Sequence, residues 1–202
     1  MKRLETLASL VDKAAKVVDI GTDHAYLPIY LYQNNVTHNI IASDVSKNVL
    51  EYSKKNLQRN DLDNKIKLVL SDGFLNIEDE YDTAIISGLG FNTIKKILEH
   101  KSLPNTLIIS SHSDIINLRK YMASINYKIA KEIYYFEKNR YYVMIKYIKG
   151  YEKLTDEEIL LGKESDKNYQ KYLLSKFQEL YIKSQNKIYL NYIKIIERKL
   201  DL

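Results

Sequence analysis

Short apolar runs alternate with helix-like stretches through the first 125 residues of this chain. The runs contain VVDI, NIIAS, KLVL, TAIIS and TLIIS, and each is closed by a polar or glycine-containing turn. Continuous apolar runs of this length are typical of strands buried on both faces of a parallel sheet. Strand and helix alternating five times predict a doubly wound α/β sheet, which binds ligands beyond the carboxyl ends of its strands. The helices are expected at residues 27–34, 48–60, 91–100 and 115–125.

The pattern changes after residue 125. Two strand-like halves, YKIAKEIYYF and RYYVMIKYI, flank Glu137-Lys138-Asn139, which indicates a hairpin with no long helix between its strands. We place the end of this domain, residues 1–150, at Gly150. Residues 151–202 are expected to form a helical, coiled-coil-like hairpin, in which TDEE predicts a capping box. A stripe at spacings of three or four predicts one long helix there, through Leu174, Phe177, Tyr181, Ser184, Ile188, Tyr192 and Ile195.

Composition limits the compartment and the chemistry. The chain has 202 residues and no cysteine, which excludes disulfides, a cysteine nucleophile and a thiolate metal site. Its start, MKRLETLASLVD, has the spacing of an amphipathic helix and not of a signal peptide, and no stretch approaches the roughly 20 apolar residues of a membrane span. We expect a cytoplasmic protein with no membrane contact. No metal is expected, because the histidines lie in separate segments, at His24, His38, His100 and His112.

The charge distribution is compatible with a polyanionic partner. The net charge is +5, and basic residues outnumber acidic ones in residues 167–199, whereas acidic residues dominate 151–166. Codon bias toward lysine, asparagine, isoleucine and tyrosine is an alternative explanation of the basicity, so it carries little weight alone.

The ends of the predicted strands carry the candidate ligand-binding residues. The first strand ends in Asp19-Ile20-Gly21, where glycine permits a ligand to approach the backbone closely. An acid about twenty residues further on is expected to accept from ribose hydroxyls. Acids and a small-residue loop in this order favour a nucleoside-containing cofactor, S-adenosylmethionine, although an aspartate after a strand is more often a helix cap. The expected contacts after the later strands are Asp44 and Val45, Asp72 and Gly73, and Ser87 and Gly88.

Asp23 and His24 stand where a dinucleotide-binding turn would have further glycines. One interpretation makes Asp23 the N-cap of the next helix and His24 a structural histidine. The other places both side chains beside the cofactor or its substrate. The two interpretations remain equally open from the sequence.

The string DIGTDHAYLP, at residues 19–28, resembles the signature of the bacterial tRNA (adenine-N1)-methyltransferases that modify adenine 22. The strand plan also resembles that of class I S-adenosylmethionine-dependent methyltransferases. The resemblance covers essentially the whole chain, densely at its start and loosely after Gly150. Two segments depart from the family pattern: Gly88-Leu89-Gly90-Phe91 replaces Gly-Met-Gly-Gly, and Ser111-His112-Ser113 replaces Gln-Pro-Asn.

The resemblance implies a methyl transfer from S-adenosylmethionine to adenine N1 of tRNA. Adenine N1 has a free lone pair, so the expected catalytic residues serve to place the base and stabilise charge: Asp23, His24 and Tyr26. It also implies tRNA contacts on a basic, tyrosine-containing arm, while the alternative for that arm is a helix packed on the domain. The expected contacts are Arg119, Tyr141, Lys167, Lys171, Lys176 and Lys183, with Lys187, Tyr169 and Tyr172 on the same arm.

Two other functions remain open from the sequence. One is a methyltransferase acting on a small molecule, and the other is an RNA-binding relative without catalysis. Residues 19–28 argue against the second, because a protein that only binds RNA does not need them. We expect a monomer that binds tRNA.

Overall fold

The computed structural model describes residues 2–99 and 102–201. Within them, the predicted strands and the hairpin are confirmed. The sheet comprises β1 (Val17–Ile20), β2 (Ile40–Asp44), β3 (Lys67–Leu70), β4 (Thr83–Leu89), β5 (Thr106–Ser111), β6 (Tyr127–Glu137) and β7 (Arg140–Lys149). The helices are α1 (Lys2–Ala8), α2 (Tyr26–Gln33), α3 (Lys47–Arg59), α4 (Phe91–Leu98), α5 (Ile115–Ser124), α6 (Asp156–Leu161), α7 (Lys167–Ser184) and α8 (Lys187–Leu200). The end of the helix expected over 91–100, at His100, lies outside the described residues.

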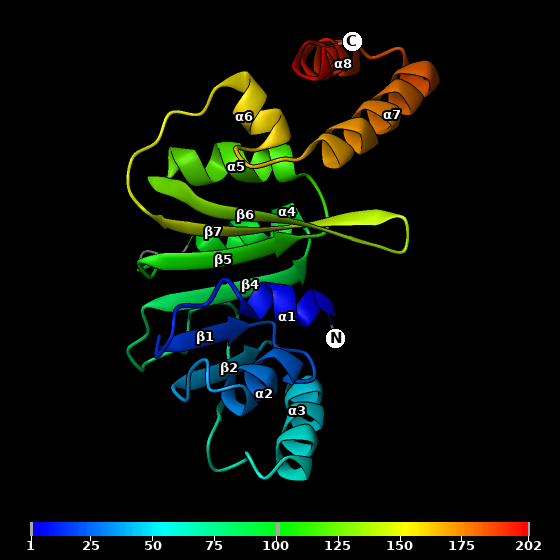
Figure 1. Ribbon diagram of the computed structural model, residues 1–202. Helices are drawn as coiled ribbons and strands as arrows, with labels where there is room; N and C mark the ends of the chain where they lie inside the picture. Colours follow the sequence, from blue (N-terminus) through cyan, green and yellow to red (C-terminus); the bar gives the residue numbers. More distant parts are fainter. Residues whose placement is uncertain (1, 100–101, 202) are drawn as a thin grey trace.

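The seven strands form one sheet in the order β3-β2-β1-β4-β5-β7-β6 (Figure 1). Strands β1 to β5 pair in parallel, whereas β7 pairs antiparallel with both β5 and β6. Lys138 and Asn139 both have positive φ, as a two-residue turn of type I′ requires. The predicted Rossmann-like methyltransferase sheet with an antiparallel hairpin is therefore confirmed.

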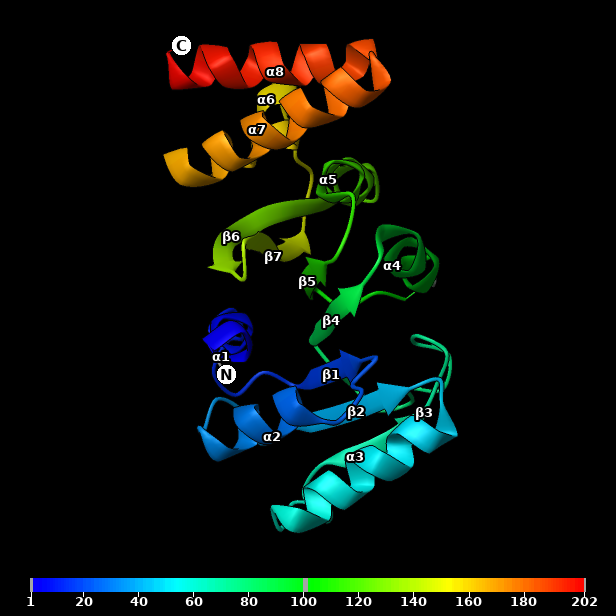
Figure 2. The ribbon, with the colours of Figure 1, turned by 90° about the vertical axis from the view of Figure 1, so that its right-hand side faces the viewer.

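The four predicted helices are present, but the connection between β3 and β4 has no helix, so strand and helix do not alternate five times. The described residues 71–82, between β3 and β4, contain turns and no helix. The four helices that do form lie on both faces of the sheet (Figure 2). Apolar residues of α1, α2 and α3 share one buried cluster, and those of α4 and α5 belong to the other. The sheet is thus buried on both faces, which explains why its central strands are uninterrupted apolar runs.

The C-terminal extension differs from the single long helix that the stripe predicts. The chain reverses at Gln185, which has a φ of 54°, and Asn186 caps α8 by accepting a hydrogen bond from the amide of Ile188. The result is an antiparallel pair, α7 and α8, preceded by the short α6 with its predicted capping box at Thr155. Apolar residues of all three helices belong to the same buried cluster as α4 and α5, so the extension packs on the sheet domain (Figure 2).

Candidate functional site

The turn after β1 is held in an unusual backbone conformation. Gly21, Asp23 and Ala25 all have positive φ, at 74°, 53° and 58°. The amides of Gly21 and Thr22 both donate to the carbonyl of Ser43 at 2.9 Å, which fixes the turn against the end of β2. Non-glycine residues seldom adopt this region, so two of them in one turn indicate a conformation imposed by the surroundings.

The backbone of Asp23 and His24 is anchored by α3. The Ser53 hydroxyl donates to the carbonyl of Asp23, and the Asn56 amide donates to that of His24 at 3.0 Å. The N-cap of α2 is Ala25, with no side-chain cap bond. Asp23 is therefore not the N-cap, and the interpretation of its carboxylate as a helix cap is wrong.

A cavity of about 470 Å³ opens at the carboxyl ends of β1, β2, β4 and β5. This volume lies within the range of small-molecule sites, roughly 300–1,000 Å³. Most of the residues predicted to bind the cofactor or act in catalysis line it together. They are Asp19, Gly21, Asp23, His24, Tyr26, Asp44, Ser87 and Gly88.

Asp19 lies at the floor of this cavity with only 3% of its surface exposed. The pKa of its carboxyl is raised to about 6: burial is the main cause, a hydrogen bond from the Thr22 hydroxyl at 2.7 Å opposes the rise, and the negative charge of Asp44 adds to it. Asp44 stands at the end of β2, where its Oδ1 accepts from the amide of Ser46 at 2.9 Å. Its other carboxylate oxygen is the group that can accept from a ribose hydroxyl.

Asp23, His24 and Tyr26 form the open side of the cavity. The side chains of Asp23 and His24 are 72% and 42% exposed, with Oδ1 and Nε2 3.6 Å apart. The His24 ring centre lies 5.3 Å from that of Tyr26 and 6.3 Å from that of Tyr52. The cavity thus has an acidic floor, while exposed aromatic rings and a carboxylate stand at its entrance.

Three predicted cofactor contacts do not line this cavity. Val45 directly follows Asp44 but is 69% exposed. Asp72 and Gly73 follow β3, which is separated from β1 by β2. Gly73 is buried with a positive φ, and a Cβ there would lie 3.3 Å from the Ile97 side chain. The role of these three residues stays a prediction.

Residues from the first helix and from the last strands of the sheet domain complete the cavity. Arg3 of α1 places its guanidinium 4.7 Å above the ring centre of Tyr142, which lies on β7. His112 follows β5, and its carbonyl accepts from the guanidinium of Arg140 at 2.5 Å. Burial lowers the pKa of His112, and the positive charges of Arg140 and Arg3 lower it further. No periodic signal in the sequence predicts these contacts, because they arise from pairing between distant segments.

Arg119 does not support the predicted tRNA contact. It is fully buried, and its guanidinium pairs with Glu132 at 2.8 Å. It also donates to the carbonyls of Ile159 and Leu160 and to the hydroxyl of Tyr134. Arg119 therefore joins α5 to β6 and α6, and its charge is not available to a phosphate.

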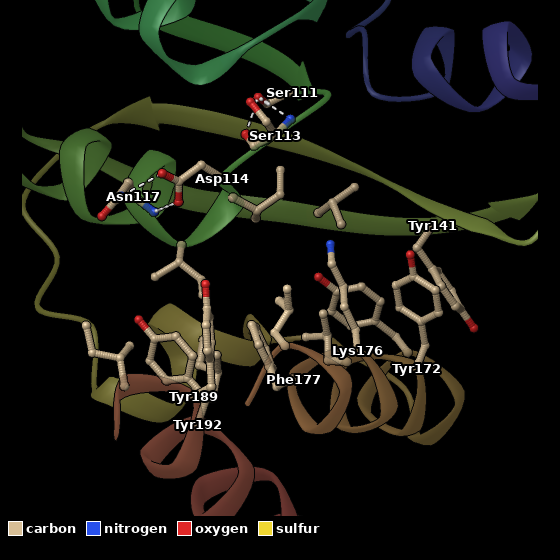
Figure 3. A pocket seen from close by; sticks show the side chains of 18 of the residues that line it. Ser111, Ser113, Asp114, Asn117, Tyr141, Tyr172, Lys176, Phe177, Tyr189 and Tyr192 are labelled. Atoms are coloured by element: carbon tan, nitrogen blue, oxygen red, sulfur yellow. Dashed lines mark hydrogen bonds between the residues drawn. The ribbon is translucent and has the colours of Figure 1, made fainter. Parts of the chain in front are cut away.

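The other predicted tRNA contacts lie on and around α7. Lys167, Lys171 and Lys183 are exposed, and Lys183 pairs with Glu179 at 2.5 Å. Tyr141 and Lys176 line a second cavity beneath α7 and α8 (Figure 3). Tyr169, expected on the surface of the arm, is instead buried against Tyr134, with ring centres 4.4 Å apart.

Known proteins match this chain along its length. The family described as "Methyltransferase domain" matches residues 1–145. A putative tRNA methyltransferase of Mycoplasma genitalium is 32% identical over 97% of this chain and 94% of its own length. The Bacillus subtilis tRNA (adenine(22)-N(1))-methyltransferase is 28% identical over 71% of this chain and 63% of its own. The structure of M. capricolum TrmK in complex with S-adenosyl-homocysteine superposes with a TM-score of 0.86 and 32% identity, covering 100% of this chain and 97% of that one.

The chain belongs to the tRNA (adenine(22)-N1)-methyltransferase family. Membership confirms the resemblance carried by residues 19–28. None of the described helices combines the length and the apolar composition that a transmembrane segment requires. The same part of the chain holds no group of three or more histidine and acidic side chains placed to bind a metal ion.

Proposed function

We propose that this protein transfers a methyl group from S-adenosylmethionine to N1 of adenine 22 in tRNA. The observation that carries the proposal is the cavity beyond β1, β2 and β4, in which two acids and the Gly21 turn lie beside Asp23 and His24. The full-length likeness to tRNA methyltransferases supports the same assignment.

The cavity suits the cofactor by its donor and acceptor chemistry. Asp44 has a carboxylate oxygen for the ribose hydroxyls, and Gly21 leaves the backbone open to close approach. When bound, S-adenosylmethionine supplies an electrophilic methyl group on a positively charged sulfur. Asp19 adds a buried acid to the same cavity, which suits a cationic ligand.

The residues at the entrance of the cavity act on the methyl acceptor, which is the target adenine. Adenine N1 carries an in-plane lone pair, so no base is needed to create the nucleophile. Methylation leaves a positive charge on the adenine ring, and the Asp23 carboxylate stabilises this charge. The rings of His24 and Tyr26 hold the base at near-attack distance, about 3–3.5 Å from the methyl carbon.

The two parts of the chain divide the task in this proposal. Residues 1–150 bind the cofactor, and residues 151–202 bind tRNA through the exposed lysines of α7. Their binding energy offsets the few kcal/mol needed to turn the target adenine out of its stack. We further propose that the protein acts as a monomer in the cytoplasm, where its substrate lies. Light scattering of the protein with and without tRNA tests the monomer.

The decisive experiment is methyl transfer with mapping of the product. The protein is incubated with S-adenosylmethionine and unmodified tRNA, and methylated adenines are located by mass spectrometry. The matched control is the same tRNA with guanine at position 22. We expect N1-methyladenine at position 22 of the first tRNA and no transfer to the second. Transfer at another position, or none to a tRNA that binds, would refute the proposal.

A further inference from the structure

A second recess of about 410 Å³ lies between the loop after β5, strand β7 and the α7–α8 pair. We call it the tyrosine recess. Figure 3 shows Tyr141 and Tyr172 at one end, Tyr189 and Tyr192 at the other, and the Lys176 side chain extending between them. Its main side chains are Tyr141, Tyr172, Lys176, Phe177, Tyr189 and Tyr192.

The aromatic rings of the recess form two groups. The ring centres of Tyr141 and Tyr172 lie 5.0 Å apart, and those of Phe177 and Tyr192 lie 5.1 Å apart. All the tyrosines named in the recess remain half-buried, so each ring keeps surface in contact with solvent. Half-exposed rings in a concave site are suited to stacking against a flat base.

Lys176 brings a positive charge into this aromatic site. It lines the recess and forms no ion pair with any described residue, whereas Lys183 on the same helix pairs with Glu179. Arg140 also lines the recess. Asp114 lies at the start of α5, where its carboxylate accepts from Asn117. An anion therefore fits beside Lys176 and Arg140 and is disfavoured near Asp114.

The recess adjoins the cofactor cavity. His112 lines both, and its carbonyl is held by Arg140. A base that receives the methyl group would lie in the cofactor cavity, within about 3–3.5 Å of the methyl carbon. The tyrosine recess is then left for a different part of the same substrate.

We infer that the tyrosine recess binds an unstacked base of tRNA next to the target adenine, with the adjoining phosphate beside Lys176 and Arg140. This inference rests on the proposed function. A nucleotide has the chemistry of the site, because its flat ring matches the tyrosines and its phosphate matches the two cations. Binding the neighbouring base in the recess also keeps the target adenine from restacking.

Substitutions in the full-length protein separate stacking from packing. Tyr172→Leu removes the ring and keeps an apolar side chain, and we expect it to weaken tRNA affinity about 5- to 150-fold. Tyr172→Phe should restore the affinity. Lys176→Gln should weaken tRNA binding and reduce the slope of log affinity against log salt by about 0.7–0.9, and Lys176→Arg should restore both. The matched control is Tyr151→Leu, since Tyr151 is 77% exposed and does not line the recess.

A fluorescent base gives a readout that does not depend on methylation. A tRNA with 2-aminopurine on one side of adenine 22, and a second with it on the other, are titrated with each variant. Binding to the unsubstituted protein should change the emission from one of the two, and Tyr172→Leu should abolish that change. S-adenosylmethionine affinity and the melting temperature, measured on every variant, identify any general loss of folding.

The outcomes distinguish this inference from the proposed function. Unchanged tRNA affinity and 2-aminopurine emission in Tyr172→Leu, with methylation of adenine 22 intact, would overturn the inference alone. A protein that binds tRNA with the expected emission change but does not methylate it would overturn the proposed function and support the recess as a base-binding site. Equal losses in Tyr172→Leu and Tyr172→Phe would also overturn the inference, because the ring is present in the second.

Discussion

At the scale of single residues, Asp23 and Asp44 take different places in the cofactor cavity. Asp44 is partly buried at the end of β2, with one oxygen bonded to its own loop. Asp23 is exposed at the entrance, and its backbone is held by α3 while its side chain is not used as a helix cap. A carboxylate that extends into solvent from a fixed backbone is suited to contact a second molecule.

Because Asp44 and Asp23 occupy different places, replacing each with alanine should have different effects, one on cofactor binding and the other on turnover. Asp44→Ala should weaken S-adenosylmethionine binding about 10- to 150-fold, because hydrogen bonds to a charged group contribute about 1.5–3 kcal/mol each. Asp23→Ala should lower kcat about 100-fold with little change in cofactor affinity, since its charge acts on the product cation. Calorimetry and single-turnover kinetics measure the two effects, with the exposed Asp63→Ala as control. Similar, mild effects of both substitutions would contradict the division.

Asp19 should make the stability of the protein depend on pH. Its pKa is raised to about 6 by burial, from 3.8 in the unfolded chain. The folded state therefore holds a proton that the unfolded state releases, so this group lowers stability progressively as the pH rises from about 4 to about 6. Asp19→Asn removes the effect. The unfolding free energy of Asp19→Asn relative to the unsubstituted protein should rise by about 2 kcal/mol from pH 4.5 to pH 7, as measured by urea unfolding. A constant difference across this range would disprove the assignment.

At the scale of secondary-structure elements, one buried polar cluster fixes the extension to the sheet domain. Glu132 accepts from Arg119 and from the amide of Lys163 at 2.7 Å, and Arg119 donates to two carbonyls of α6. Gly162 passes so close that a Cβ there would lie 2.5 Å from a Glu132 carboxylate oxygen. The chain turns out of α6 at a point where only glycine fits, and this sets the direction in which α7 begins.

Replacing one charged residue of this cluster should destabilise the protein more than replacing both. Arg119→Met leaves the Glu132 charge buried and unpaired, which should destabilise the protein by about 3–5 kcal/mol. Adding Glu132→Gln removes that charge and should recover part of the loss. Urea unfolding of the two single variants and the double variant measures the coupling, with Lys120→Met, an exposed position in α5, as control. Additive losses would show that the pair does not act as a unit.

The sequence predicted elements whose signals are local. The apolar runs identified β1 to β5, and Lys138-Asn139 identified the hairpin. The break between α7 and α8 was missed because neither Gln185 nor Asn186 is a glycine or proline, and the stripe of apolar residues continues across it. The stripe residues on both helices pack against the same cluster, and only Ser184 and Ile188 beside the turn are exposed, so periodicity alone does not reveal the reversal.

The site was predictable where it depends on strand ends and not where it depends on pairing between distant segments. The residues around Gly21 and the acid at Asp44 followed from the order of the strands. The burial of Arg119 depends on Glu132 and on carbonyls about forty residues away, which no local pattern encodes. The family resemblance therefore assigned Arg119 to tRNA, although its charge is used inside the fold.

At the scale of the whole molecule, the two cavities draw on different parts of the chain. Every residue lining the cofactor cavity lies between Arg3 and Met144. The tyrosine recess combines the sheet domain with α7 and α8. The extension is therefore not needed to build the cofactor cavity, but it is needed to build the recess and to cover the buried cluster of α5.

These facts change what a truncation should do. The sequence alone suggests that removing the residues after Gly150 leaves cofactor binding intact. The structure predicts that this cut also lowers stability, because it exposes Arg119 and Glu132 and removes the apolar cover supplied by α6. A cut after Ser165 keeps α6, Gly162 and the amide of Lys163. We expect the 1–165 fragment to melt at a higher temperature than 1–150 and to bind S-adenosylmethionine within about twofold of the full chain, a difference of about 0.4 kcal/mol.

Both fragments should lose most of their tRNA affinity, because the lysines of α7 are absent from each. Scanning calorimetry and filter binding with the full chain as control measure the two properties separately. Equal melting temperatures for the two fragments would contradict the structural role of α6. A 1–165 fragment that bound tRNA as tightly as the full chain would show that α7 and α8 only pack on the domain. Stability and RNA affinity should thus separate along the extension, the first depending on α6 and the second on the helices that follow it.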